Sequence, residues 1–249
     1  MTTPPNDPFA QHPPQVAAPG YPQASAPGSP PPPPLPGQAP PPGAFAPTGW
    51  AAEKPQGLAI TAIVLTGLYA ASSLYSSFVA QSTIDETKAT LGSGNTATDL
   101  GTTAFGALGT IVMLASFVVL ALWMSRIRRN LASRGVKAGG PPAVEWWGWF
   151  VPLANFVLPL LGMKAISRKK ASMGLLLGWW LPWCIMWLAT FAAGATSFFA
   201  VDLGTGELVR PEALDASVPL THIATVAVIV SWAFLAVIIR RVTDRHLDD

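Results

Sequence analysis

Residues 103–124 read TAFGALGTIVMLASFVVLALWM, an unbroken apolar run without an ionisable side chain. A helix needs about 20 such residues to cross the roughly 30 Å hydrocarbon core of a bilayer. Three further runs have similar length and character, and we expect each to be a span: 58–80, 172–200 and 219–239. The sequence therefore predicts an all-α integral membrane protein with four transmembrane helices in a membrane domain at 58–240.

The composition agrees with a membrane protein and argues against other classes. Half of the residues are hydrophobic and 11% are charged, whereas an ordinary soluble domain carries about 25% charged residues. A net charge of +2, with no basic stripe, argues against nucleic acid as a partner. The single cysteine, Cys184, lies within an apolar run and has no second cysteine to pair with.

The charged loops predict the orientation of the spans. The loops at 81–102 and 201–218 are acidic on balance. Basic residues gather after the second span, before the third and after the fourth: Arg126, Arg128, Arg129, Arg134, Lys137, Lys164, Arg168, Lys169, Lys170, Arg240, Arg241 and Arg245. Cytoplasmic loops carry the excess of Lys and Arg. We therefore expect both termini to be cytoplasmic, the C-terminus as a short segment at 241–249.

The segment at 146–163, WWGWFVPLANFVLPLLGM, is apolar enough to be counted as a fifth span. Both of its flanks are basic, and Pro152 and Pro159 each remove a helical hydrogen bond. A re-entrant or interfacial element satisfies both facts best, although a fifth span stays open. The polar Asn155 lies between the prolines, where it either braces the loosened backbone or contacts a polar ligand.

A motif runs through this region from Leu122 to Ser167. It consists of an aromatic-ended span, an Arg-rich turn with an Asn, and a Trp-rich segment with two prolines and a Met: Trp123, Arg126, Arg129, Asn130, Trp147, Trp149, Phe150, Pro152, Asn155, Pro159 and Met163. This motif resembles the bacterial membrane family known as domain of unknown function 4328. The chain departs from the family pattern at Leu160 and Ser167.

The resemblance implies a membrane architecture in a bacterial cell membrane and no defined activity. Its candidate site residues are those of the motif with polar, aromatic or backbone-breaking side chains: Arg126, Arg129, Asn130, Trp147, Trp149, Pro152, Asn155 and Pro159.

Residues 1–57 form a proline-rich tail that we expect to be disordered and cytoplasmic. The tail holds 19 of the chain's 26 prolines, and proline interrupts both helices and central strands. The run Pro30–Pro34 favours polyproline II. The tail then either docks into the aromatic groove of a polyproline-recognising protein or serves as a solvated spacer.

The chain carries none of the common catalytic motifs, such as HExxH, GxSxG, CxxC or a P-loop. We therefore expect no enzyme activity, cofactor or metal. Two stripes recur at helical spacing, and each is interpreted either as helix packing or as the wall of a ligand site. They are the polar stripe Tyr69, Ser72, Ser73, Ser76 and Ser77 and the aromatic stripe Trp180, Trp183 and Trp187.

Two functions follow from these features. The leading one is a non-enzymatic scaffold or regulator that acts through the proline-rich tail and the Trp-rich element on the cytoplasmic face. The alternative is a transporter or binder of an uncharged solute or lipid. The expected partners are the bilayer and a polyproline-recognising protein, and homo-oligomerisation stays open.

Overall fold

A computed structural model describes residues 54–92, 100–141, 143–151, 153–202, 204–205 and 207–248, with side chains in the helix that follows residue 100 described from Gly106 onward. The predictions for the tail before Lys54 and for Pro152 fall outside these residues. Within them the fold is helical, and the extended backbone amounts to one bridge between Val201 and Leu208.

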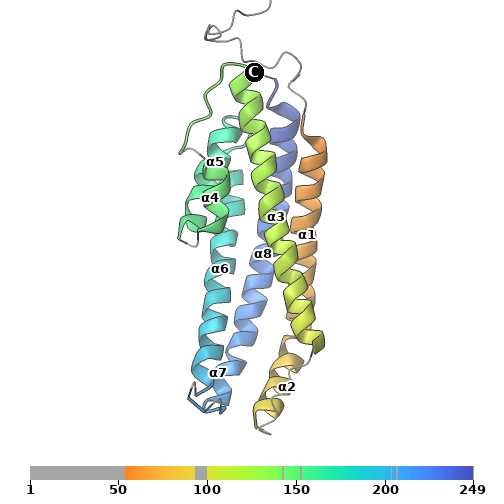
Figure 1. The fold of residues 1–249 in the computed structure, drawn as a ribbon, viewed down its shortest axis with the longest axis vertical. Helices are drawn as coiled ribbons and strands as arrows, with labels where there is room; N and C mark the ends of the chain where they lie inside the picture. The colour runs from red at the N-terminus through yellow and green to blue at the C-terminus, as the bar shows by residue number, and fades with distance from the viewer. Residues whose placement is uncertain are drawn as a thin grey trace, which may run out of the picture. The chain divides into compact units, whose positions relative to one another are not determined.

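Four long helices run along the molecule (Figure 1): α1 (Gln56–Phe78), α3 (Leu100–Ser133), α6 (Met173–Ala200) and α8 (Ser217–Arg245). Two shorter helices, α2 (Ala80–Gly92) and α7 (Pro211–Asp215), adjoin α1 and α8. In the described part of the chain, four helices are long and apolar enough to cross a membrane. The prediction of an all-α fold with four such helices is confirmed.

The boundaries of the long helices have local causes. The Ser172 hydroxyl accepts a hydrogen bond from the Leu175 N–H at 3.3 Å and caps the start of α6. At the C-terminal end of α3, the chain continues to Gly135, whose φ of 73° lies in the left-handed region. The amide of Val136 then bonds the Leu131 carbonyl at 3.0 Å, which closes the last turn of the helix.

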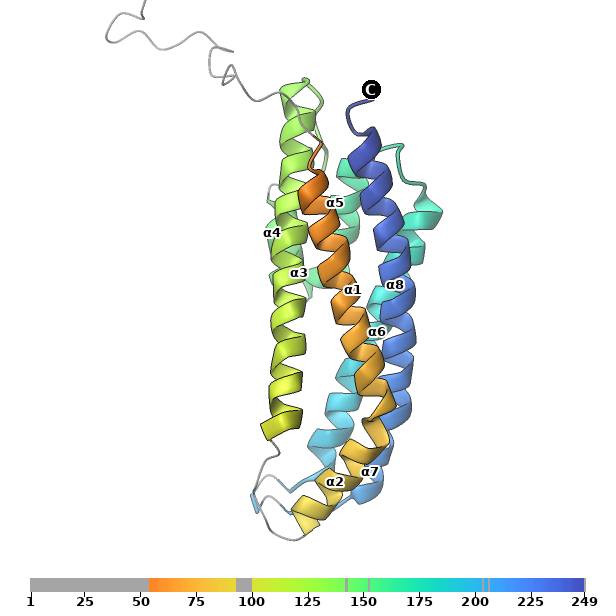
Figure 2. The same cartoon turned by 90° about the vertical axis from the view of Figure 1, so that its right-hand side faces the viewer.

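The long helices do not form a closed ring. α8 packs extensively on α6, and α1 packs on both α3 and α8, so the order in space is α3, α1, α8, α6 (Figures 1 and 2). Direct contacts between α3 and α6 are few. Three short elements fill the space beside these two helices near the C-terminus: α4 (Val144–Phe150), the 3-10 helix η1 (Ala154–Phe156) and α5 (Leu158–Ser167).

These three elements form the segment for which the sequence left a fifth span open. Pro159 lies in the first turn of α5, where its missing N–H would have no helical partner in any case. Gly148 of α4 faces this turn, and a Cβ there would lie 3.2 Å from Leu158 Cβ. The result is a tight helical hairpin, in which α4 has 7 residues and α5 has 10. Neither helix is long enough to cross a bilayer.

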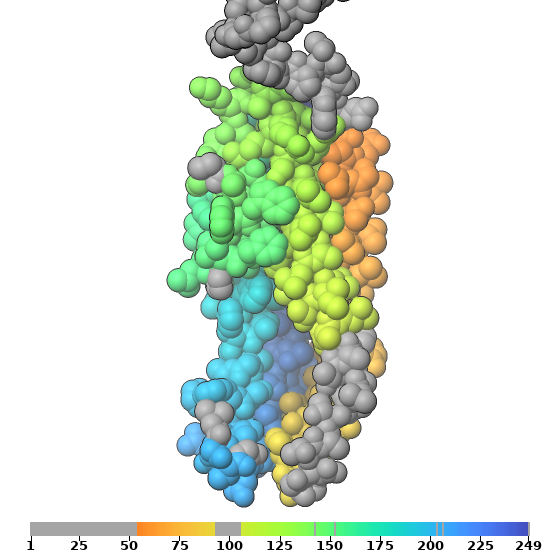
Figure 3. All heavy atoms as spheres, viewed as in Figure 1, coloured from red at the N-terminus to blue at the C-terminus, as the bar shows by residue number. Residues whose placement is uncertain are grey.

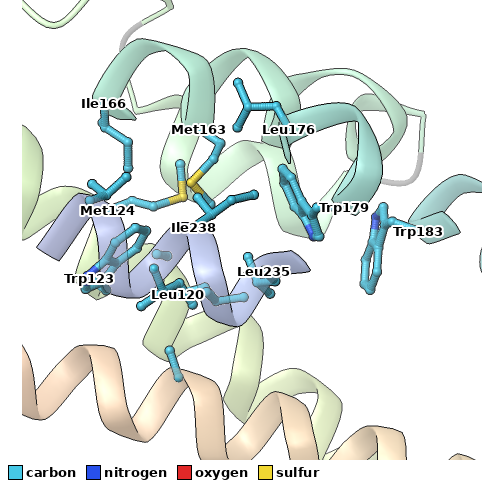
Figure 4. Packing of buried hydrophobic residues seen from close by; sticks show 14 of the residues in the cluster. Leu120, Trp123, Met124, Met163, Ile166, Leu176, Trp179, Trp183, Leu235 and Ile238 are labelled. Carbon is cyan, nitrogen blue, oxygen red and sulfur yellow. The ribbon is translucent and has the colours of Figure 1, made fainter. Parts of the chain in front are cut away.

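The core is concentrated where the hairpin meets the long helices (Figure 4). Leu120, Trp123 and Met124 of α3 lie against Met163 and Ile166 of α5 and against side chains of α6 and α8. We call this the packed half of the molecule; it is the half that also contains Lys54 and His246. The opposite half, which contains Phe78 and Ala200, is called the open half.

Candidate ligand-binding groove

A cavity of about 370 Å³ lies in the open half, between α3 and α6. Figure 3 shows α8 at the floor of a hollow between these two helices, beyond the end of the hairpin. We call this cavity the lateral groove. All four long helices contribute hydroxyl groups to its lining, which includes Ser72, Ser73, Ser76, Thr110, Thr190, Thr221 and Thr225. Among the described residues, no charged side chain lines it.

Most of these hydroxyl groups donate to backbone carbonyls. Ser72 and Ser73 both donate to the Tyr69 carbonyl, at 2.8 and 3.0 Å. Thr190 donates to the Met186 carbonyl at 2.8 Å, one turn back along α6. In apolar surroundings this is the usual bond for a helical Ser or Thr. The proton of each hydroxyl is then engaged, whereas its oxygen still has acceptor capacity.

Thr225 differs because its bond crosses between helices. Its hydroxyl, on α8, donates to the Ser73 carbonyl of α1 at 3.1 Å. A second bond between the same helices runs from the Trp232 indole to the Ile63 carbonyl, also at 3.1 Å. Together these bonds join α1 to α8, and the bond of Thr225 lies at the floor of the lateral groove.

A ladder of aromatic rings leads from the lateral groove into the packed half. The rings of Trp187 and Trp183 lie edge to face with centroids 6.0 Å apart. Trp183 meets Trp149 of α4 at 6.1 Å, and Trp149 stacks on Phe117 of α3 at 5.3 Å. A narrow cavity of about 30 Å³ accompanies this ladder, and Tyr69 and Met113 line both cavities. We call the narrow cavity the inner extension.

Two sets of indole groups differ in their hydrogen bonds. Those of Trp123, Trp180 and Trp232 donate to Thr243 and to the carbonyls of Phe156 and Ile63. In contrast, the ring nitrogens of Trp149, Trp183 and Trp187 are buried and find no hydrogen-bond partner within the described structure. Trp187 lines the lateral groove, and the other two line the inner extension. The buried indoles without a partner therefore gather at the groove and its extension.

Polar contacts tie the elements together at the far end of the open half. Ser77 of α1 and His222 Nδ1 of α8 are hydrogen-bonded at 2.5 Å. Lys88 of α2 forms an ion pair with Asp215 of α7, also at 2.5 Å. These contacts join α1 and α2 to α7 and α8 beyond the groove residues Ser76 and Thr221.

A second polar cluster surrounds His246 in the packed half. His246 is 1% exposed, and its Nδ1 donates to the Thr243 carbonyl at 2.9 Å. Since the proton lies on Nδ1, Nε2 accepts from the amide of Asn130, also at 2.9 Å. Burial lowers the pKa of His246, and the charges of Lys54 and Arg134 lower it further, against hydrogen bonds to the backbone that raise it. The neutral ring thus joins α3 to the end of α8.

A buried ion pair holds the hairpin to α3. Arg128 Nε lies 3.3 Å from the carboxylate of Glu145, in the first turn of α4. Glu145 is 7% exposed. A carboxylate near a helix N-terminus also meets the positive end of the helix dipole.

Residues 92–244 match the family described as Domain of unknown function (DUF4328), which is more than half of the chain. The chain belongs to this family. No curated protein and no solved structure matches the chain. The DUF4328 region contains α3 to α7 and nearly all of α8 but not α1, so the α1 wall of the lateral groove lies outside it.

The DUF4328 motif residues do not converge on one site. Asn130 bonds His246, Trp149 and Asn155 are buried in the hairpin, and Pro159 begins α5. Trp147 is 63% exposed, Arg129 is exposed and Arg126 is half-buried, whereas Pro152 is not described. Trp149 lines the inner extension, and none of the other described motif positions lines it or the lateral groove.

The groove contains residues that the motif did not include. From the sequence we do not single out Thr110, Thr190, Thr221 and Thr225, although we weigh the α1 stripe and the aromatic stripe with Trp187 as a ligand wall. A hydroxyl in every span is the pattern that points to such a groove. The described residues contain no group of three His, Cys, Asp or Glu side chains placed to hold a metal. The docking role of the tail stays a prediction.

Proposed function

We propose that this protein binds an uncharged amphipathic lipid in the lateral groove, within a bacterial cell membrane. The observation that carries the proposal is a cavity of about 370 Å³ lined by hydroxyl groups from all four span-length helices. Ligand sites commonly have volumes of about 300–1,000 Å³ and combine apolar walls with a few polar groups. The lining described for the groove offers no charge to neutralise a charged head group.

The expected membrane orientation places the groove toward the outer leaflet. Basic residues of the loops flank the packed half, which favours a cytoplasmic position for that half and both termini. The hairpin leaves α3 and reaches α6 at this same end of the molecule (Figure 1). It is then a cytoplasmic-side re-entrant or interfacial element, with the exposed ring of Trp147 suited to the head-group level.

Binding is favoured over transport because the packed half obstructs a path through the molecule. Beyond the lateral groove the interior narrows to the inner extension of about 30 Å³. Farther along, Leu120, Trp123 and Ile238 are each at most 1% exposed. The proposal therefore contains no translocation step and no catalytic step.

For the scaffold hypothesis, the hairpin offers the exposed ring of Trp147 but not two other motif residues. Trp149 and Asn155 are buried at 4% and 6% exposure, and so they offer no surface to a partner protein. A regulatory role through the tail is independent of this result and rests on the tail sequence.

Filling the groove tests the proposed function. A Cβ on Gly109 would lie 3.9 Å from Ser72 Oγ, and one on Gly106 would have no neighbour within 4 Å. Because both glycines line the groove, Gly109→Leu and Gly106→Leu should occupy it without a backbone clash. The matched control is Gly194→Leu, since Gly194 of α6 also has open space but lies outside the groove lining.

The measurement is the amount of neutral lipid that copurifies in mild detergent, determined by mass spectrometry of extracts. We expect the Gly109→Leu protein to retain at least about fivefold less than the parent and the control to match the parent. Equal retention by the parent and both groove variants would refute the proposal.

A further inference from the structure

The lateral groove and its inner extension present two kinds of unused hydrogen-bonding capacity. The hydroxyls of Ser72, Ser73 and Thr190 donate to the backbone, and so they face a ligand as acceptors. The indoles of Trp187 and Trp183 are donors without a partner within the described structure. An indole can only donate, so each set requires an opposite group on the ligand.

The unpaired indoles are unusual for a buried position. A buried N–H without a partner loses the hydrogen bond that water would give it, and lipid supplies no water to satisfy it. Trp183 is 7% exposed and lines the inner extension. Trp180, on the same helix, does bond a carbonyl, at 2.7 Å. The three buried indoles without a partner, those of Trp149, Trp183 and Trp187, therefore all belong to rings that line the cavities.

We propose that the lateral groove binds diacylglycerol, an inference that rests on the proposed function. Its free hydroxyl donates to the Ser and Thr oxygens of the groove, and an ester carbonyl accepts from the Trp187 indole. The Trp183 indole serves a second carbonyl at the mouth of the inner extension. The acyl chains lie along the open side between α3 and α6.

Other membrane molecules fit this arrangement less well. A hydrocarbon offers neither a donor nor an acceptor, and an oxidised quinone offers carbonyls but no donor. A phospholipid or fatty acid carries a charge, which no described lining residue neutralises and which is costly to remove from water. A neutral lipid with one hydroxyl and two esters supplies both kinds of group.

Three short-chain probes separate these contributions. Dioctanoylglycerol has the hydroxyl and both carbonyls, its acetylated derivative lacks the hydroxyl, and dioctylglycerol diether lacks the carbonyls. Their affinities for the full-length protein in detergent are measured by competition with a fluorescent diacylglycerol. We expect the parent protein to bind dioctanoylglycerol about three- to tenfold more tightly than either of the other probes, as for one or two hydrogen bonds in a membrane protein.

The Trp187→Phe variant removes one of the two donors, and it should reduce the preference for dioctanoylglycerol over the diether while its affinity for the diether is unchanged. Thr190→Val removes an acceptor at constant shape and should weaken the two hydroxyl-bearing probes but not the acetylated one. Trp147→Phe is the control, because Trp147 is exposed and lines neither cavity. If Trp187→Phe fails to fold, as judged by thermal unfolding, Trp183→Phe takes its place.

The outcomes distinguish this inference from the proposed function. If the parent binds all three probes equally but Gly109→Leu abolishes binding, the groove is a lipid site and the diacylglycerol assignment is wrong. The same holds if Trp187→Phe and Trp183→Phe both keep the parent's preference. If no probe binds and copurified lipid is unaffected by Gly109→Leu, both proposals are wrong.

Discussion

The packed half and the open half are built from the same four long helices but differ in what lies between α3 and α6. In the packed half, the hairpin inserts Met163 and Ile166 against α3, and these residues are at most 2% exposed. In the open half the same two helices border a cavity of about 370 Å³. A short insertion along one half of a bundle thus closes it and leaves the other half able to hold a ligand.

The comparison predicts that the largest loss of stability comes from shortening a buried side chain in the packed half. Trp123 is 0% exposed, and its indole donates to Thr243 at 3.0 Å. Replacing a buried Trp by Ala usually costs about 3–5 kcal/mol, so Trp123→Ala should destabilise the protein by that amount. Thermal unfolding in detergent is the measurement, with the exposed Trp147→Ala as control. A change below about 1 kcal/mol would mean that this half is loosely packed.

A smaller effect is expected where α6 and α8 meet. A Cβ on Gly178 would lie 2.5 Å from the Phe234 ring, whereas one on Gly174 would meet only Ser172 Oγ at 3.9 Å. Overpacking costs about 1–3 kcal/mol, partly offset by the better helix propensity of Ala. Gly178→Ala should therefore destabilise by roughly 1 kcal/mol and Gly174→Ala should not, as measured by the same unfolding assay. Equal effects would show that α6 and α8 are free to separate.

His246 predicts a pH dependence that originates in the packed half. Its folded-state pKa is lowered by burial, so the unfolded chain binds the proton more readily. The neutral ring contributes fully to the free energy of unfolding above the pKa of His246 in the unfolded chain, about 6.5. This contribution is lost as the pH falls from there toward the lower pKa of the folded state. Stability should fall by at most about 1.4 kcal/mol per pH unit. His246→Asn should flatten this slope between pH 7 and 5; an unchanged slope would exclude His246 as its source.

The smallest effect is expected from the floor of the lateral groove. Thr225→Val keeps the side-chain shape and removes the bond to the Ser73 carbonyl. Hydrogen bonds between membrane helices contribute about 0.6 kcal/mol on average, and we expect a loss of that size in unfolding. A loss of unfolding free energy above about 2 kcal/mol would mean that the helices of the open half are held together as strongly as those of the packed half.

The sequence predicted the fold better than the site, for physical reasons. Span-length helices follow from apolar length, and Pro159 agrees with the break between η1 and α5, whereas the non-crossing of this segment stays a prediction. The groove depends on how far apart α3 and α6 lie, which no local pattern encodes. The same limit applies to the partner of His246, because its contact with Asn130 joins two residues that are 116 positions apart in the chain.

The position of α1 affects where the functional unit can be cut. The family match begins at residue 92, after α1 has ended at Phe78. Yet the carbonyls of Ile63 and Ser73 accept bonds from Trp232 and Thr225, and a Cβ on Gly67 would lie 3.1 Å from the Trp232 ring. A protein truncated at the family boundary would leave two donors of α8 unsatisfied and would lack the α1 wall of the cavity. The smallest intact unit therefore begins at α1, upstream of the shared region.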